Sequence, residues 1–227
     1  MNMMNLSELW GHFKFLSDVQ TLSEQEKTFL QKFLAVEYEQ RRLNRIQHLL
    51  RMSGIKRVKL LSEFDWTFNP KLPRERFMEF INTQWLKRTA NLVLVGPAGV
   101  GKTHLAKGLC HDSIMKGQHT LFLSLFDLNA KMARAKTIYS FVEYYAKAPV
   151  LCIDELGYTL PSKEQADCLF QIISKRSEIG TTIITTNLIP SQWGKVFETV
   201  TASAILDRLS MNGTFITLEG KSYRNPK

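Results

Sequence analysis

The sequence predicts an α/β protein in which a parallel β-sheet flanked by helices follows a small all-helical region. Two observations support this fold class. Short apolar runs recur within residues 91–227, and helical segments separate them, which is typical of parallel strands joined by helices. Residues 1–90 instead repeat apolar side chains at helical spacing and contain no such run.

The composition is that of a folded protein. The chain has 227 residues, of which 44% are hydrophobic and 22% charged, so we expect one ordinary domain with a helical appendage. No apolar run is long enough to cross a bilayer, and Met1–Trp10 lacks the basic start of a secretory signal. The three cysteines are odd in number and show no C-x-x-C spacing. We therefore expect no disulfide framework or zinc site, no membrane association and a bacterial cytoplasmic location.

The first part of the chain predicts two helices. Residues 6–16 and 29–34 place apolar side chains at helical spacing, and Ser23 with Glu26 forms a capping box at the start of the second helix. Gly54 is a stop signal for it. The expected organisation is a helical N-terminal domain over 1–54 that binds DNA or oligomerises, a linker over 55–73, and a core over 74–227.

A basic run lies at the end of this helical region. The net charge of the chain is +9, which favours a polyanionic partner without identifying it. The run contains no acidic residue, so we expect its positive charge to be unneutralised locally and to bind the phosphate backbone of DNA. The alternative is an ordinary solvated helix face. The basic residues of the run are Arg41, Arg42, Arg45, Arg51, Lys56, Arg57 and Lys59.

The segment after the basic run combines aromatic and proline residues. An aromatic stretch spans 64–68, and we interpret it as packing rather than as a ligand site. Pro73 can start a further helix whose apolar face ends at Trp85.

The core opens with the clearest motif. Residues 91–95 form a fully apolar strand candidate that runs into G-x-x-x-x-G-K-T at 96–103. Its glycines allow backbone N–H groups to surround a phosphate, and the helix that follows presents its positive end. In such a loop the lysine, here Lys102, reaches the β- and γ-phosphates, and the hydroxyl of Thr103 binds Mg²⁺. The motif consists of Gly96, Pro97, Ala98, Gly99, Val100, Gly101, Lys102 and Thr103.

An acidic pair supplies the second part of a nucleotide site. The apolar run 149–153 leads into Asp154 and Glu155, so both carboxylates are expected at the carboxyl end of a central strand. We expect Asp154 to hold Mg²⁺ and Glu155 to act as the base that polarises the attacking water.

Two further polar residues complete the predicted site. Asn187 follows the strand candidate 182–186 and is placed to hold the water or the γ-phosphate; alternatively it is a turn residue. Arg208 lies on a short helix before the strand candidate 214–218. It either pairs with the adjacent Asp207 or neutralises the γ-phosphate in the site of a neighbouring subunit.

Together these residues resemble the AAA+ ATPases, and more closely the IstB-like helpers of insertion-sequence transposition. The resemblance runs along nearly the whole chain and rests on 96–106, 153–158, 184–188, 206–208 and 220–224. It implies that ATP binds at 96–103 and the adjoining His104, that Asn187 is the sensor asparagine, and that Arg208 acts in trans. It also implies a homo-oligomeric ring or helical filament around duplex DNA and a transposase encoded alongside.

The resemblance further implies five parallel strands without a C-terminal helical lid domain. The expected strands lie near 91–95, 120–125, 149–154, 182–186 and 214–218. A second set of DNA contacts is expected on the helix after the second strand, where Lys131 and Arg134 share one face and Lys136 follows. Lys175 and Arg176, at the end of a later helix, can complement its negative end.

Three alternatives remain at this point. A replicative helicase loader of the DnaC type shares the same chemistry. A small-molecule kinase would instead need an acceptor-binding residue and a mobile cover over the phosphates. A DNA-binding module without hydrolysis would leave Glu155 and Arg208 without a role.

Overall fold

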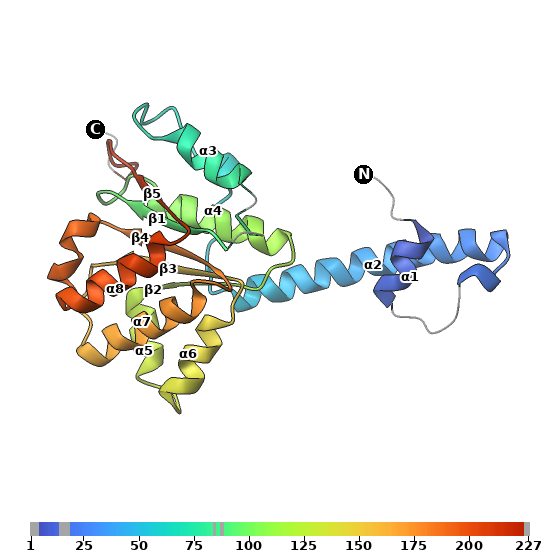
Figure 1. Ribbon diagram of the computed structural model, residues 1–227. Coiled ribbons are helices and arrows are strands. Elements are labelled where there is room, and N and C mark those ends of the chain that lie inside the picture. The colour runs from blue at the N-terminus through green and yellow to red at the C-terminus, as the bar shows by residue number, and fades with distance from the viewer. Residues whose placement is uncertain (1–4, 14–18, 84, 87–88, 225–227) are drawn as a thin grey trace. The chain divides into compact units, whose positions relative to one another are not determined.

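The computed structural model describes residues 5–13, 19–83, 85–86 and 89–224 (Figure 1). The chain divides into two compact units, residues 1–48 and residues 49–227. The two units are described one after the other.

The first unit is helical, as the sequence predicts. It contains α1 (Leu6–Phe13), the short 3₁₀ helix η1 (Val19–Thr21) and most of α2 (Glu24–Met52). The predicted cap of α2 is confirmed, because Ser23 N donates to Glu26 Oε2 (2.8 Å) and Glu26 N donates to Ser23 Oγ (3.4 Å). The last residues of the predicted first helix, 14–16, lie outside the described part of the chain.

The segment expected as a linker packs on the core of the second unit. Ser53, just after α2, accepts a hydrogen bond through its carbonyl oxygen from Phe122 N (2.7 Å). The 3₁₀ helix η2 (Leu61–Glu63) follows, and Phe64 and Leu72 are buried in a hydrophobic cluster of the core. The aromatic stretch is therefore packing, and residues 55–73 belong to the second unit.

The second unit is built on a five-stranded parallel sheet, as expected. The strand order is β2-β3-β4-β1-β5. Each strand lies within two residues of its predicted place at either end. The strands are β1 (Asn91–Val95), β2 (Thr120–Ser124), β3 (Val150–Leu156), β4 (Thr181–Thr186) and β5 (Gly213–Thr217).

Helices cover both faces of this sheet (Figure 1). Side chains of successive strand residues point to opposite faces. In β1, Leu92 and Leu94 pack in one hydrophobic cluster, and Val93 and Val95 pack in the other. The first cluster takes in α3 (Arg74–Asn82) and α4 (Lys102–Met115). The second takes in α5 (Leu125–Met132), α6 (Ile138–Ala146), α7 (Lys163–Arg176), η3 (Pro190–Lys195) and α8 (Thr199–Ser210).

One buried cation connects the helices α6 and α7 to the sheet. Arg176, at the end of α7, is fully buried and donates to the carbonyl oxygens of Tyr145, Ala146, Ala148 and Thr181 and to Thr182 Oγ1. Burial lowers the pKa of its guanidinium to about 9. Arg176 therefore satisfies carbonyl groups at the ends of other elements rather than those of its own helix. Its neighbour Lys175 pairs with Glu143 on α6 (2.6 Å).

Candidate nucleotide-binding site

The G-x-x-x-x-G-K-T motif forms the turn between β1 and α4, as predicted. Its three glycines, Gly96, Gly99 and Gly101, all have positive φ angles (154°, 84° and 100°). At Gly101, the N-cap of α4, a Cβ atom would lie 2.5 Å from the ring of Phe64. The loop therefore opens onto the positive end of a 14-residue helix, where N–H groups are free to bind an anion.

The Lys102 side chain folds back onto this loop. Its Nζ donates to the carbonyl oxygens of Gly96 (2.6 Å) and Pro97 (2.7 Å). Burial lowers the pKa of Lys102, the negative charge of Asp154 opposes that shift, and the positive charge of Arg224 adds to it. A bound phosphate would offer Lys102 a charged acceptor in place of two neutral ones, which favours anion binding here.

A network of three side chains lies beneath the loop. Thr103 Oγ1 donates to Asp154 Oδ1 (3.0 Å), and Thr185 Oγ1 donates to the same carboxylate oxygen from β4. Glu155 N in turn donates to Thr185 Oγ1 (3.0 Å). The network joins residues from α4, β3 and β4, and Asp154 within it is 6% exposed.

An irregularity in β3 separates the two acidic residues. The register between β3 and β4 shifts between Ile153 and Leu156, and Glu155 has a positive φ of 61°. A bulge of this kind redirects side chains beside functional sites. Here it leaves Asp154 buried against the threonines, while the Glu155 side chain is exposed. The two carboxylates are thus placed for different roles.

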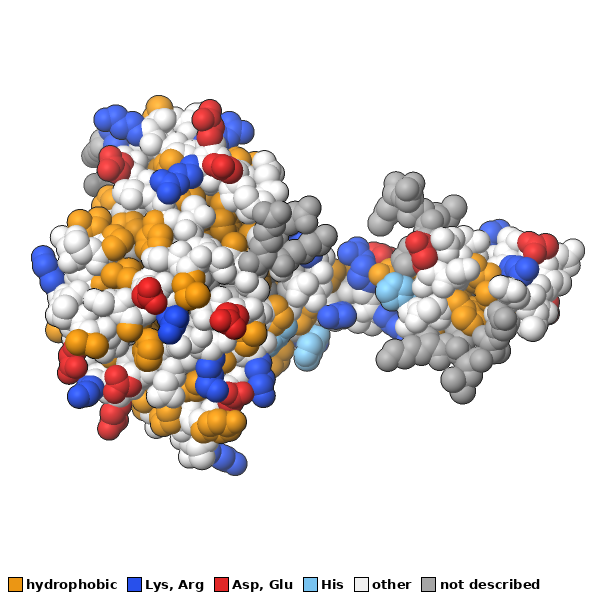
Figure 2. Space-filling view, viewed as in Figure 1, with side chains coloured by type: hydrophobic (Ala, Val, Ile, Leu, Met, Phe, Trp, Pro, Cys, Tyr) orange, Lys and Arg blue, Asp and Glu red, His pale blue; other side chains and the backbone are white. Residues whose placement is uncertain are grey.

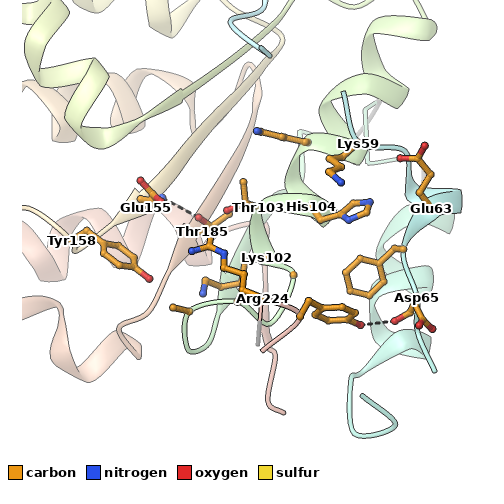
Figure 3. Close-up of a pocket in the computed structure, with 16 residues that line it drawn as sticks. Lys59, Glu63, Asp65, Lys102, Thr103, His104, Glu155, Tyr158, Thr185 and Arg224 are labelled. Atoms are coloured by element: carbon orange, nitrogen blue, oxygen red, sulfur yellow. Dashed lines mark hydrogen bonds between the residues drawn. The ribbon is translucent and has the colours of Figure 1, made fainter. Parts of the chain in front are cut away.

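A cleft of about 490 Å³ runs along the loop (Figure 3). Of the predicted residues, Ala98, Gly99, Gly101, Lys102, Thr103, His104 and Glu155 line it. Figure 3 shows Glu155, Tyr158, Thr185 and Arg224 on one side of the loop and Lys59, Glu63 and Asp65 on the other. The predicted His104 contacts this second side, because its Nε2 lies 2.8 Å from Leu60 O.

Several lining residues were not singled out by the sequence prediction. Thr185 lies within a predicted strand, but only its contact with Asp154 across the β3–β4 pair reveals its role. Arg224 and Tyr223 belong to a stretch that carried the family resemblance without an assigned role. Glu63 and Asp65 come from the segment expected as a linker, which is why the prediction omitted them. Lys59 was predicted as part of the basic run, and here it lines the cleft.

Six residues predicted for nucleotide binding, Mg²⁺ binding or catalysis do not line the cleft: Gly96, Pro97 and Val100 belong to the phosphate loop, Asp154 lies in the threonine network, and Asn187 and Arg208 lie in neither. Asn187 follows β4 with an exposed side chain, beside Gly157. Arg208 lies near the end of α8, where its carbonyl oxygen accepts from Asn91 Nδ2 (3.5 Å). Asn91 is the first residue of β1, whereas the phosphate loop follows the last. Arg208 therefore lies near the amino ends of the strands, whereas the cleft lies at their carboxyl ends. Its guanidinium lies 3.7 Å from Asp207.

The basic run on α2 is partly neutralised, contrary to expectation. Arg41 Nε lies 2.6 Å from Glu37, and Arg42 lies 2.8 Å from Glu39. The acids precede the run by one helical turn, so a search for acids only within the run missed them. Figure 2 shows basic and acidic side chains interspersed on the visible face of the first unit and also over the second unit.

The second predicted set of basic residues differs from expectation in its backbone. Lys131 lies in the last turn of α5, but this helix ends at Met132 and Ala133 caps it. Arg134 and Lys136 therefore lie in the connection to α6, whose N-cap is Thr137. All three side chains are exposed. Among the described residues, no helix combines the length and apolar character needed to span a membrane.

Comparisons with known proteins agree with this site. The profile of the family "IstB-like ATP binding protein" matches residues 2–227. The chain is 36% identical over 199 residues to the "Insertion sequence IS232 putative ATP-binding protein" of Bacillus thuringiensis subsp. berliner, covering 86% of this chain and 80% of the relative. It is 34% identical to the corresponding protein of insertion sequence IS21 of Pseudomonas aeruginosa, covering 87% and 76%.

Solved structures show the same fold at lower identity. DnaI has a TM-score of 0.60 at 24% identity, covering 72% of this chain and 89% of that one. The DnaC helicase loader has a TM-score of 0.55 at 21% identity, covering 76% and 99%. The second unit thus has the P-loop AAA+ fold. Because the profile match spans almost the whole sequence, the chain belongs to the family of IstB-like ATP-binding proteins.

Proposed function

We propose that this protein is an ATPase that assembles on duplex DNA and, with a partner transposase, assists insertion-sequence transposition. The observation that supports ATP hydrolysis is the different burial of Asp154 and Glu155. One carboxylate is buried on the threonine network and the other is exposed in the cleft beside the phosphate loop. A site that only binds nucleotide has no need of the second.

The cleft residues divide the work of hydrolysis. Lys102 and the N–H groups of the loop bind the phosphates, and Glu155 polarises the attacking water. Thr103 and Asp154 offer the hydroxyl and carboxylate oxygens that Mg²⁺ prefers, within 3.0 Å of each other. Bound there, Mg²⁺ would neutralise charge on the phosphates. Thr185 keeps Asp154 oriented, and Arg224 adds positive charge from the same subunit.

Asn187 completes this set as the residue that senses the γ-phosphate or its water. It lies next to Gly157, two residues beyond Glu155, so a small movement of either loop changes its distance to the cleft. We assign it this role from the family pattern and from that adjacency.

Assembly follows from the place of Arg208. A residue at the amino end of β1 cannot neutralise phosphate charge in a cleft at the carboxyl end of the same strand. It can do so in the cleft of the next subunit, as a trans-acting arginine. Repeating that contact produces a ring or a helical filament.

DNA binding is assigned to the exposed basic side chains. On α2 and after it they include Arg45, Arg51, Lys56 and Arg57, and on the second unit Lys131, Arg134 and Lys136. Contacts of this type bind phosphates and carry no direct information on base sequence. The transposase partner is inferred from the relatives, which are named as insertion-sequence proteins.

The test is ATP turnover with and without duplex DNA, for the unmodified protein and for Glu155→Gln. We expect turnover by the unmodified protein, stimulated by DNA, and a loss of about 100-fold or more in the variant, since general-base catalysis contributes roughly 10²–10⁴. The variant should still bind ATP and should stay on DNA longer. If Glu155→Gln turns over ATP at the unmodified rate, the assignment of the base is wrong.

A further inference from the structure

The last described residues cross directly over the phosphate loop. We call residues 218–224 the C-terminal strap. Its first residue, Leu218, donates through its N–H to Val95 O (2.7 Å), just before the loop. Tyr223 N donates to Gly99 O (2.9 Å), in the middle of the loop. The strap is therefore attached to both the start and the crest of the loop.

A single buried side chain fixes the middle of the strap. Asn69, 4% exposed, donates through Nδ2 to Lys221 O (2.8 Å) and accepts through Oδ1 from Lys221 N (2.8 Å). The amide thus satisfies both backbone groups of one residue 152 positions away. Asn69 is itself held, because Leu72 N donates to its carbonyl oxygen (2.9 Å) and Leu72 is buried in the core.

Tyr223 holds the end of the strap against the aromatic segment. Its ring lies 4.4 Å from the ring of Phe68 and 5.5 Å from that of Phe64, between centroids. Its hydroxyl donates to the carbonyl oxygen of Asp65. Burial raises the pKa of Tyr223, so the hydroxyl keeps its proton and remains a donor.

Two glycines make this close approach possible. A Cβ atom on Gly220 would lie 2.5 Å from Asn69 Oδ1, and one on Gly99 would lie 2.0 Å from Ser222 Oγ. Both distances are far below van der Waals contact. The phosphate loop, the strap and Asn69 are therefore in direct contact, and a shift of one must move the others.

The strap ends by directing a cation into the cleft. Arg224 N donates to Ser222 Oγ (3.1 Å), and the side chain of Arg224 lies among the lining residues close to Lys102 (Figure 3). Two positive charges that converge in one cleft repel each other unless an anion lies between them. Arg224 is held in that position by backbone contacts of the strap, which Asn69 anchors.

We propose that Asn69 is a positioning residue for ATP hydrolysis, which acts by holding the strap so that Arg224 reaches the phosphates. The inference rests on the proposed ATPase function. Asn69 touches no reacting atom in this scheme, and its effect passes entirely through the strap. It differs from a purely structural clamp in one respect: its contribution to catalysis disappears when Arg224 is absent.

A double-mutant cycle tests this difference. ATP turnover is measured on the full chain with duplex DNA for Asn69→Ala, Arg224→Ala and the double variant, with kcat and KM determined separately. We expect Arg224→Ala to lower kcat/KM by about 100-fold, as removal of one preorganised donor does. We expect Asn69→Ala to lower it by at least 10-fold and the double variant to be no worse than Arg224→Ala alone. If the two effects multiply, Asn69 does not act through Arg224.

Two further variants keep the test decisive. Asn69→Asp retains the acceptor for Lys221 N but sets a buried carboxylate oxygen against Lys221 O, so it should lower turnover at least as far as Asn69→Ala, and combining it with Arg224→Ala should again add nothing. Asn82→Ala, an exposed asparagine at the end of α3, is the matched control and should leave turnover unchanged. Absence of turnover in the unmodified protein would overturn the ATPase proposal, whereas multiplicative effects would overturn only the role of Asn69.

Discussion

The nucleotide cleft and the basic helix α2 hold their charged groups in opposite ways. In the cleft, Asp154 is buried and accepts hydrogen bonds from Thr103 and Thr185, which are 51 and 31 positions away in sequence. On α2, Arg41 and Arg42 form ion pairs with acids three or four positions away on the same helix, and Arg41 also lies 4.8 Å from the ring centroid of Phe13 on α1. The cleft geometry therefore depends on the whole fold, while the ion pairs of Arg41 and Arg42 are local to α2.

This difference predicts how each region responds to change. Groups fixed by distant contacts are pre-organised and lose little entropy when the nucleotide binds. Single substitutions in the cleft should therefore lower ATP turnover strongly. Exposed charges on a helix surface act through a screened field, so single substitutions should cost little and the cost should vary with salt.

The largest effect is expected at Arg208, which belongs to neither region of its own subunit. We expect Arg208→Ala to lower assembly-dependent ATP turnover by roughly 10³-fold, the lower range for a trans-acting arginine. ATP binding by the isolated subunit should be unchanged, because the cleft does not contain Arg208. Turnover assays and a fluorescent ATP analogue measure the two quantities.

Mixing experiments separate a trans role from a structural one. Lys102→Ala removes the phosphate contact but leaves Arg208 intact, so each variant alone should be inactive. A mixture of Arg208→Ala and Lys102→Ala should regain activity, since some junctions then combine an intact cleft with an intact arginine. No recovery in mixtures that still assemble would contradict the trans assignment.

The neighbouring cations Lys175 and Arg176 repeat the same comparison within one helix. We expect Arg176→Met to lower the free energy of unfolding by roughly 3–5 kcal/mol, because several buried carbonyl groups lose their donor at about 1–3 kcal/mol each. Lys175→Met removes an ion pair with Glu143 and a cation–π contact with the exposed Tyr139 ring at 5.9 Å, and should cost about 1 kcal/mol. Urea unfolding of both variants measures the difference, and equal costs would show that burial does not set it.

A smaller effect is expected at Thr185, the link between the two acidic residues. Thr185→Val keeps the shape but removes the hydroxyl that donates to Asp154 and accepts from Glu155 N. We expect turnover to fall by about 10-fold, as expected for one hydrogen bond to a charged group at about 1.5–3 kcal/mol. Thr185→Ser restores the hydroxyl and should recover most of the loss. Melting temperatures check that neither variant unfolds.

The sequence predicted the elements better than the contacts between them. The phosphate loop, Asp154 and Glu155 could be located because each follows an apolar run, and parallel strands bring their carboxyl ends to one edge. Thr185 could not be found in this way, since its role depends on the register of β3 against β4. Asn69 and Arg224 were missed for a similar reason. They are connected through the C-terminal strap, and the packing of the strap on the core leaves no periodic pattern in the sequence.

The smallest effect is expected on α2, where paired and unpaired arginines can be compared directly. Arg51 forms no ion pair with any residue that the structure describes, whereas Arg41 is paired with Glu37 at 2.6 Å. If the basic residues of α2 bind DNA phosphates, Arg51→Gln should lower the slope of log affinity against log salt by about 0.9, the value for one lost contact. Arg41→Gln should lower it less, because Glu37 already neutralises that charge. DNA affinity measured between about 50 and 200 mM salt separates the two variants by roughly threefold. Equal slopes for both variants would mean that Arg41 loses its pairing with Glu37 when DNA binds. Arg41 would then resemble Lys102 in the cleft, which exchanges carbonyl oxygens of its own loop for a phosphate.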